Sequence, residues 1–206
     1  MSEAEMKRGE GRVFAIGDIH GCSTALRALL EAIDPCPEDT VVILGDFMDC
    51  GPDSKGVVEQ LIALSNRCRL TCLLGNHEEM LLNALESRSE LRYWLKLGGK
   101  QTINSYCAYG ADLEMIPPAH VKFIRGCRAY FETETHIFVH ANYDPDLPIE
   151  RTSGTRLRWE SLDLDRLRPH CSGKTVVVGH TPRSVAMCST WASCYASTPI
   201  ASGEVG

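Results

Sequence analysis

Five short apolar runs alternate with segments of helical periodicity along the chain. The apolar runs are nearly continuous, as expected for strands buried on both faces, and they cover residues 12–16, 40–44, 70–74, 136–139 and 174–178. Apolar residues recur at helical spacing in segments 23–33, 54–65, 78–85, 91–97 and 118–124. Ser23 is the expected cap of the first helix, and the segment 143–155, rich in Pro, Asp and Gly, is expected to be a loop. This alternation predicts an α/β fold with a largely parallel sheet covered by helices.

Polar side chains follow each predicted strand at the point where it ends. The five endings are Gly-Asp-Ile-His-Gly at 17–21, Gly-Asp-Phe-Met-Asp at 45–49, Gly-Asn-His-Glu at 75–78, His-Ala-Asn at 140–142 and Gly-His-Thr at 179–181. The carboxyl edge of an open α/β sheet is where ligands bind. Glycine before the polar residue lets the backbone turn sharply and approach a ligand closely. Because one such ending is common but five in one chain are not, we expect a metal site at this edge.

The donor set suits a hydrolytic site with two metal ions. It combines carboxylate, amide and imidazole groups and no thiolate, which favours manganese, iron or zinc in a catalytic setting; the six candidate ligands are Asp18, His20, Asp46, Asn76, His140 and His180. Six ligands are too many for one ion that keeps positions open for substrate. They are enough for two ions that share one carboxylate, hold a bridging hydroxide and stabilise an in-line displacement at phosphorus.

A general acid is also predicted from the spacing. His77 stands beside Asn76 and is placed to protonate a leaving oxygen, and Asp49 lies three residues after Asp46, where it can hold the tautomer of a histidine.

Composition narrows the class of protein and its partners. The 206 residues are 44% hydrophobic and carry a formal net charge of −6, which argues against a nucleic-acid partner. We find no run long enough to span a membrane and no signal-peptide core, so no membrane partner is expected. The ten cysteines include no C-x-x-C pair, and a cytoplasmic location with reduced thiols is predicted. We expect one domain over residues 12–182 after a flexible N-terminus at 1–11.

The motifs resemble the signature blocks of a known enzyme family. The segments 17–21, 45–51 and 75–78, together with His140 and Gly179-His180-Thr181-Pro182, are similar to the blocks of the phosphoprotein phosphatase (PPP) family of calcineurin-like metallophosphoesterases, and most similar to its bacterial branch. The resemblance implies a β-sandwich flanked by helices with a dimetal site at the strand ends. It also implies a serine/threonine protein phosphatase that hydrolyses phosphomonoesters of proteins or peptides, usually with manganese.

The resemblance further assigns roles to the candidate residues. It implies that Asp18, His20 and Asp46 bind one metal ion, that Asp46, Asn76, His140 and His180 bind the other, and that His77 paired with Asp49 is the general acid. Asn76 and an arginine after His140 are expected to contact the substrate phosphate. Arg156 and Arg158 are the first candidates for that arginine, and Arg166 and Arg168 remain open.

The chain departs from the family pattern at Cys50. The second block of the family ends Asp-Arg-Gly, and its arginine clamps the substrate phosphate, whereas this chain has Cys50 there. A thiol lacks the fixed fork of donors of a guanidinium group. The loss of one such donor is expected to lower catalytic efficiency by about 10²–10³-fold.

The second departure is the tail at 183–206, which is mostly Ser, Ala, Thr and Cys with no strand period. A back-translation of residues 187–205 read two bases later gives V-L-D-L-G-L-V-L-R-L-D-T-Y-C-V-G-G-G, which resembles the family's usual ending. The tail is therefore interpreted as atypical, and a frameshift or truncation after Pro182 is the hypothesis.

Three functions follow as alternatives. The first is a protein serine/threonine phosphatase, and the second is a dinucleoside tetraphosphatase of the same family that acts on a small phosphoester. The third is a catalytically impaired copy that binds metal or phosphoprotein without useful turnover.

Overall fold

The computed structural model describes residues 11–107, 113–181 and 194–196. The tail hypothesis concerns residues that lie almost entirely outside these ranges. Within the described ranges, seven strands form two sheets: β1 (Val13–Ile16), β2 (Thr40–Ile43), β3 (Arg69–Cys72), β4 (Tyr130–Glu132), β5 (His136–Val139), β6 (Thr175–Val178) and β7 (Cys194–Ala196). The α-helices are α2 (Ser23–Ile33), α3 (Ser54–Leu64), α4 (Asn76–Glu86), α5 (Arg88–Trp94), α6 (Lys100–Tyr106), α7 (Pro118–Arg125) and α8 (Gly154–Arg158). Short 3-10 or π turns cover Leu95–Gly99, Leu113–Met115, Ile149–Arg151 and Leu164–Arg166.

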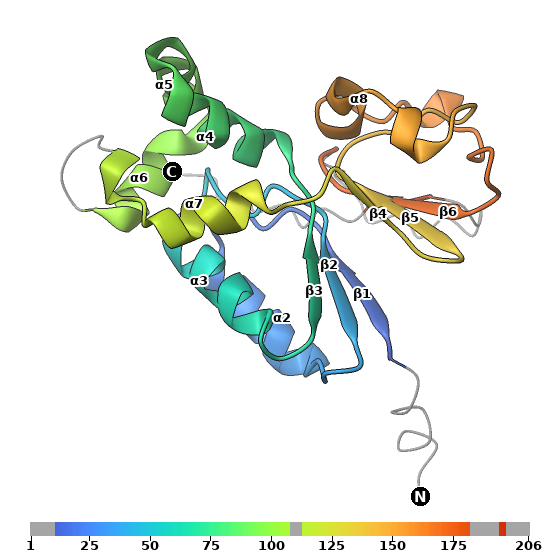
Figure 1. The fold of residues 1–206 in the computed structure, drawn as a ribbon, viewed down its shortest axis with the longest axis horizontal. Helices are drawn as coiled ribbons and strands as arrows, with labels where there is room; N and C mark the ends of the chain where they lie inside the picture. The colour runs from blue at the N-terminus through green and yellow to red at the C-terminus, as the bar shows by residue number, and fades with distance from the viewer. Residues whose placement is uncertain (1–10, 108–112, 182–193, 197–206) are drawn as a thin grey trace, which may run out of the picture.

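The five predicted strands are confirmed, and they are divided between the two sheets. The first sheet has the order β1-β2-β3 and is parallel throughout. The second has the order β4-β5-β6-β7, in which β4 is antiparallel to β5 and the other pairs are parallel. Figure 1 shows the two sheets on opposite sides of the sandwich, with α2 and α3 along the outer side of the first.

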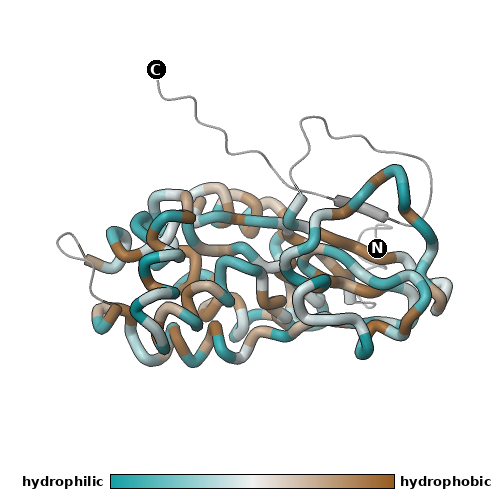
Figure 2. The backbone as a smooth tube through the Cα atoms, turned by 90° about the horizontal axis from the view of Figure 1, so that it is seen from above, coloured by the Kyte–Doolittle hydropathy of each residue, from teal (hydrophilic) through white to brown (hydrophobic). Residues whose placement is uncertain are grey.

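Side-chain alternation along the strands builds three layers of core. Val41 and Ile43 of β2 pack with the helices α2 to α7, whereas Val42 between them packs against Phe138 of β5 and Val177 of β6. This period of two is what a strand buried on both faces requires. On the outer face of the second sheet, strand residues pack with Leu157 of α8. The predicted β-sandwich flanked by helices is therefore confirmed. Hydrophobic and hydrophilic residues alternate along the coiled segments in Figure 2, as expected for helices that are buried on one side.

Some local predictions are corrected by the structure. Cys22, not Ser23, occupies the N-cap of α2, and it makes no side-chain capping bond. The predicted loop at 143–155 contains one 3-10 turn and the first residues of α8. The tail, whose sequence has no strand period, contributes the short strand β7, which pairs in parallel with β6. Within the described ranges, no helix is both long and apolar enough to cross a membrane.

Candidate dimetal site

The candidate ligands converge at the carboxyl ends of five strands, where the two sheets meet. Asp18 and His20 follow β1, Asp46 follows β2, and Asn76 begins α4 just after β3. His140 and His180 follow β5 and β6 of the other sheet. Backbone and side-chain hydrogen bonds join the two sheets here: His140 Nδ1 donates to the Leu44 carbonyl at 2.7 Å, and the His180 N–H donates to both oxygens of Asp18 at 3.1 Å.

Two groups of possible ligands share Asp46. One contains Asp18, His20 and Asp46, the other contains Asp46, His140 and His180, and within each group the ligand atoms lie within 4.8 Å of one another. In the second group, His140 Nε2 is 3.3 Å from Asp46 Oδ2 and 3.2 Å from His180 Nδ1. The structure therefore brings five of the six expected ligands into two groups joined by one carboxylate.

Asn76, the sixth expected ligand, provides a test of whether cations fit here. Its Oδ1 lies 3.1 Å from His140 Nε2. The same oxygen is 3.0 to 3.2 Å from His180 Nδ1 and both carboxylate oxygens of Asp46. The amide satisfies these acceptors when its NH₂ group is turned toward them, and it offers one more oxygen ligand when a cation lies among them. The donor set thus fits divalent metal ions such as manganese, iron or zinc.

The backbone at these positions is strained. Six residues other than glycine have a positive φ among those the structure describes, and five of them are in this region: His20, Asp46, Asp49, Cys50 and His180. Such conformations cost of order 1–3 kcal/mol each and persist where the surroundings fix them, typically at functional sites. Glycines allow the close packing, since a Cβ on Gly75 would lie 2.2 Å from Asp46 Oδ1.

The predicted pair of His77 and Asp49 is close enough to hydrogen-bond. His77 Nδ1 lies 2.9 Å from Asp49 Oδ2, and the His77 side chain is 14% exposed. Asp49 is fully buried and accepts two further hydrogen bonds, from Trp94 Nε1 at 2.7 Å and from Thr102 Oγ1 at 2.6 Å. These donors fix both carboxylate oxygens, so His77 Nδ1 carries the proton of the contact and Nε2 is turned toward the site.

Buried charges shift the ionisation of the site. Burial disfavours charge on Asp46, but His140 outweighs it and holds the pKa of Asp46 well below its usual range. Burial likewise opposes a proton on His140, but Asp46 raises the pKa of His140 to about 9. The pKa of Asp18 is raised by burial and by the charge of Asp46. For His77, the hydrogen bond to Asp49 and nearby carboxylate charges overcome burial and raise the pKa.

The role of Glu78 was not predicted from the sequence. Its side chain holds the loops that carry the candidate ligands, here called the ligand loops. Its buried carboxylate accepts four backbone N–H groups: those of Phe47 and Met48 on Oε1 at 3.0 and 3.3 Å, and those of Asp46 and Gly75 on Oε2 at 2.8 and 3.0 Å. Burial, and then the charge of Asp46, raise the pKa of Glu78 to about 8. Its position inside the Gly-Asn-His-Glu block was the available signal. Trp94 and Thr102, the donors to Asp49, were not predicted either.

The arginines expected to bind substrate phosphate are paired with carboxylates. Arg156 contacts Asp144 at 2.7 Å and Glu160 at 2.8 Å, and Arg158 contacts Glu79 at 2.6 Å. Arg166 and Arg168 pair with Asp163 and Asp146. Arg158 joins α8 to α4, the helix that begins with Asn76. None of these contacts selects a phosphate ligand, and the assignment of Arg156 and Arg158 stays a prediction.

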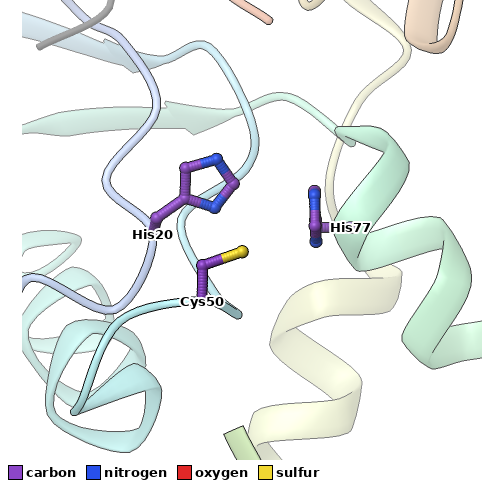
Figure 3. Close-up of side chains that lie close together, drawn as sticks. All are labelled: His20, Cys50 and His77. Carbon is purple, nitrogen blue, oxygen red and sulfur yellow. The ribbon is translucent and has the colours of Figure 1, made fainter. Parts of the chain in front are cut away.

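Cys50 is exposed at the mouth of the site, between His20 and His77 (Figure 3). Burial of the sulfur, followed by the charges of Asp49 and Asp46, raises the pKa of the Cys50 thiol.

A β-sandwich whose strand ends gather Asp, Asn and His side chains is the architecture of metal-dependent phosphoesterases. The chain belongs to the calcineurin-like phosphoesterase family, whose sequence model matches residues 11–193.

The individual relatives carry the names of two different activities. The chain is 34% identical over 134 residues to serine/threonine-protein phosphatase 1 of Salmonella typhimurium, a match that covers 64% of this chain and 59% of the relative. It is 33% identical over 140 residues to a symmetrical bis(5'-nucleosyl)-tetraphosphatase of Janthinobacterium, a match that covers 68% of this chain and 46% of the relative. A solved structure provisionally described as a diadenosine tetraphosphatase matches with a TM-score of 0.61 and 26% identity, over 82% of this chain and 75% of that one. The matched region thus spans about half of the length of the two curated relatives.

Proposed function

We propose that the protein is a dimetal phosphoesterase that hydrolyses phosphomonoesters, and that it acts as a serine/threonine protein phosphatase. The observation that carries this proposal is Asp46, which is common to both groups of possible ligands and buried between the two sheets. A shared carboxylate is what holds two cations close enough to act on one phosphate group.

In this proposal each group at the site has a separate task. Two divalent ions, with manganese expected, neutralise charge on the phosphate and supply an activated water when bound. Asp18 and His20 hold one ion, His140 and His180 the other, and Asn76 presents its amide oxygen to the second. His77 protonates the leaving oxygen from Nε2, and Asp49 keeps the proton of the other nitrogen in place.

The decisive experiment measures hydrolysis of p-nitrophenyl phosphate by the purified chain with and without added manganese. Manganese-dependent turnover is expected, and Asp46→Asn is expected to abolish it because the shared carboxylate is lost. Asp34→Asn is a matched control, since this carboxylate is exposed and pairs with Arg67 outside the ligand groups. Unchanged activity in the Asp46 variant would refute the two-metal assignment, and absence of turnover in the folded, manganese-loaded wild type would favour an impaired copy.

A second candidate is a dinucleoside tetraphosphatase. It is supported by the Janthinobacterium relative, which is similar over as much of this chain as the phosphatase is. Turnover of a phosphoserine peptide and of diadenosine tetraphosphate, compared as kcat/KM on one preparation, separates the two. Preference for the dinucleotide would replace the protein-phosphatase assignment and leave the dimetal chemistry in place.

A further inference from the structure

Three side chains from separate elements form a second kind of metal-ligand set at the mouth of the site. His20 follows β1, Cys50 follows β2 and His77 lies in the first turn of α4, and their ligand atoms are within 4.8 Å of one another. Figure 3 shows the Cys50 sulfur pointing into the space between the two imidazole rings. Cys50 is exposed, so an ion can reach the three groups from solvent.

The tautomers of both histidines leave a lone pair available. His20 Nδ1 lies 3.1 Å from the Met48 carbonyl oxygen, and His77 Nδ1 lies 2.9 Å from Asp49 Oδ2. Since both partners are acceptors, each Nδ1 carries a hydrogen, and each Nε2 is the nitrogen that can bind an ion once it holds no proton. The rings meet edge-on, with centroids 4.9 Å apart. A carbonyl or carboxylate on the far nitrogen is the usual support of a metal-binding histidine.

The backbone holds the cysteine in this position. Asp49 and Cys50 both have positive φ, at 66° and 62°. The Cys50 N–H donates to the Gly98 carbonyl at 3.4 Å, and a Cβ on Gly98 would lie only 2.8 Å from the Cys50 sulfur. The sulfur is thus confined by the turn at Leu95–Gly99 on one side and faces the histidines on the other.

We propose that His20, Cys50 and His77 form a thiolate and bis-imidazole site that binds one zinc ion in competition with the dimetal centre. Zinc takes Cys and His ligands at about 2.3 and 2.0–2.1 Å in a tetrahedral arrangement, so the three ligand atoms need to close by roughly 1 Å. Manganese and magnesium prefer oxygen ligands, and the sulfur therefore selects the softer ion. On binding, the Cys50 thiol and a protonated His77 Nε2 each release a proton to solvent, the sulfur–zinc and nitrogen–zinc bonds form, and no electron is transferred.

The expected consequence of zinc binding at this site is inhibition of hydrolysis, and this part of the inference rests on the proposed function. Zinc at this site occupies Nε2 of His77, the atom proposed to protonate the leaving group, and takes His20 from the first ion. The activating ion of the dimetal centre and the inhibiting zinc ion would then compete for His20.

Titration of the metal-free protein with Co²⁺ tests the site without relying on activity. Thiolate bound to Co²⁺ gives sulfur-to-cobalt charge-transfer absorption in the near ultraviolet, which the oxygen and nitrogen ligands of the dimetal centre do not give. We expect this absorption in the wild type, its displacement by added Zn²⁺, and its loss in Cys50→Ser. Cys171→Ser is the matched control, because Cys171 is also exposed and lies in another part of the fold. His77→Ala should weaken zinc binding by at least about tenfold.

The outcomes separate this inference from the proposed function. Absence of the absorption in folded wild-type protein, or its persistence in Cys50→Ser, would overturn the zinc site while leaving manganese-dependent hydrolysis untouched. Absorption that is lost only in Cys50→Ser, in a protein without manganese-dependent turnover, would retain the zinc site and reject the proposed function. If both hold, Zn²⁺ should inhibit the manganese-supported reaction at least about tenfold more strongly in the wild type than in Cys50→Ser.

Discussion

Replacement of Glu78 by glutamine tests how the ligand loops are held. The carboxylate accepts two backbone N–H groups on each oxygen, from the loop that carries Asp46 and from Gly75. Glutamine keeps one oxygen and exchanges the other for an NH₂ group. Whichever way the amide turns, its NH₂ group faces two N–H donors, and both of these donors lose their acceptor.

The expected cost follows from that count. A buried N–H without a partner costs about 1–3 kcal/mol, so the Glu78→Gln variant should lose about 2–6 kcal/mol of unfolding free energy. For a chain of this length each kcal/mol corresponds to about 2–4 °C in Tm. The melting temperature should therefore fall by on the order of 10 °C, and the lost free energy is a large part of the stability of an ordinary domain.

Thermal and urea unfolding of the two proteins measure this loss at about pH 9, where the Glu78 carboxyl, whose pKa is about 8, is ionised. Glu86→Gln is the matched control on the same helix, because the Glu86 side chain is 73% exposed and forms a surface ion pair with Arg125. Its effect should stay below about 1 kcal/mol. If Glu78→Gln were no less stable than Glu86→Gln, the carboxylate would not be what holds the ligand loops, and the reasoning from its four hydrogen bonds would fail.

Three further changes probe separate parts of the structure. Thr102→Val should cost about 1.5–3 kcal/mol by removing a donor to the buried Asp49 carboxylate, whereas Thr102→Ser should restore most of it; equal losses in thermal unfolding would contradict the role of the hydroxyl. Arg12 holds the pKa of Asp39 well below its usual range, so ionised Asp39 stabilises the fold above about pH 4 and that contribution is lost as the pH falls below this value. The Tm advantage of the wild type over Asp39→Asn should accordingly shrink in acid, and a constant difference would argue against the linkage. Cys50→Arg should raise kcat/KM for phosphoester hydrolysis by about 10²–10³-fold, and a folded variant with unaltered kcat/KM would show that the missing guanidinium is not limiting.

The fold was largely predictable because most of its strands are recognisable from local sequence. A continuous apolar run such as the one in β2 is typical of a strand buried on both faces. Polar residues follow each of these runs and mark where the strand ends. The sequence could not predict the short strand β4, which has only three residues, or the N-cap at Cys22, whose geometry depends on backbone contacts rather than on a capping side chain.

The site was predictable in its residue types but not in its supports. Asp18, His20 and Asp46 carry recognisable motifs, and the structure brings them together. Trp94 and Thr102 come from helices further along the chain than Asp49, at sequence separations of 45 and 53, and no local pattern connects them to it. Such contacts arise from tertiary packing, which a single sequence does not display.

Because the candidate ligands are divided between two sheets, cutting the chain into two fragments would separate them. A break between α7 and β4 would leave Asp18, His20 and Asp46 on one fragment and His140 and His180 on the other. The group of Asp46, His140 and His180 would then exist only in the reassembled pair. Metal ions should therefore promote association of the two fragments, and hydrolysis that is regained when they are mixed would measure this association.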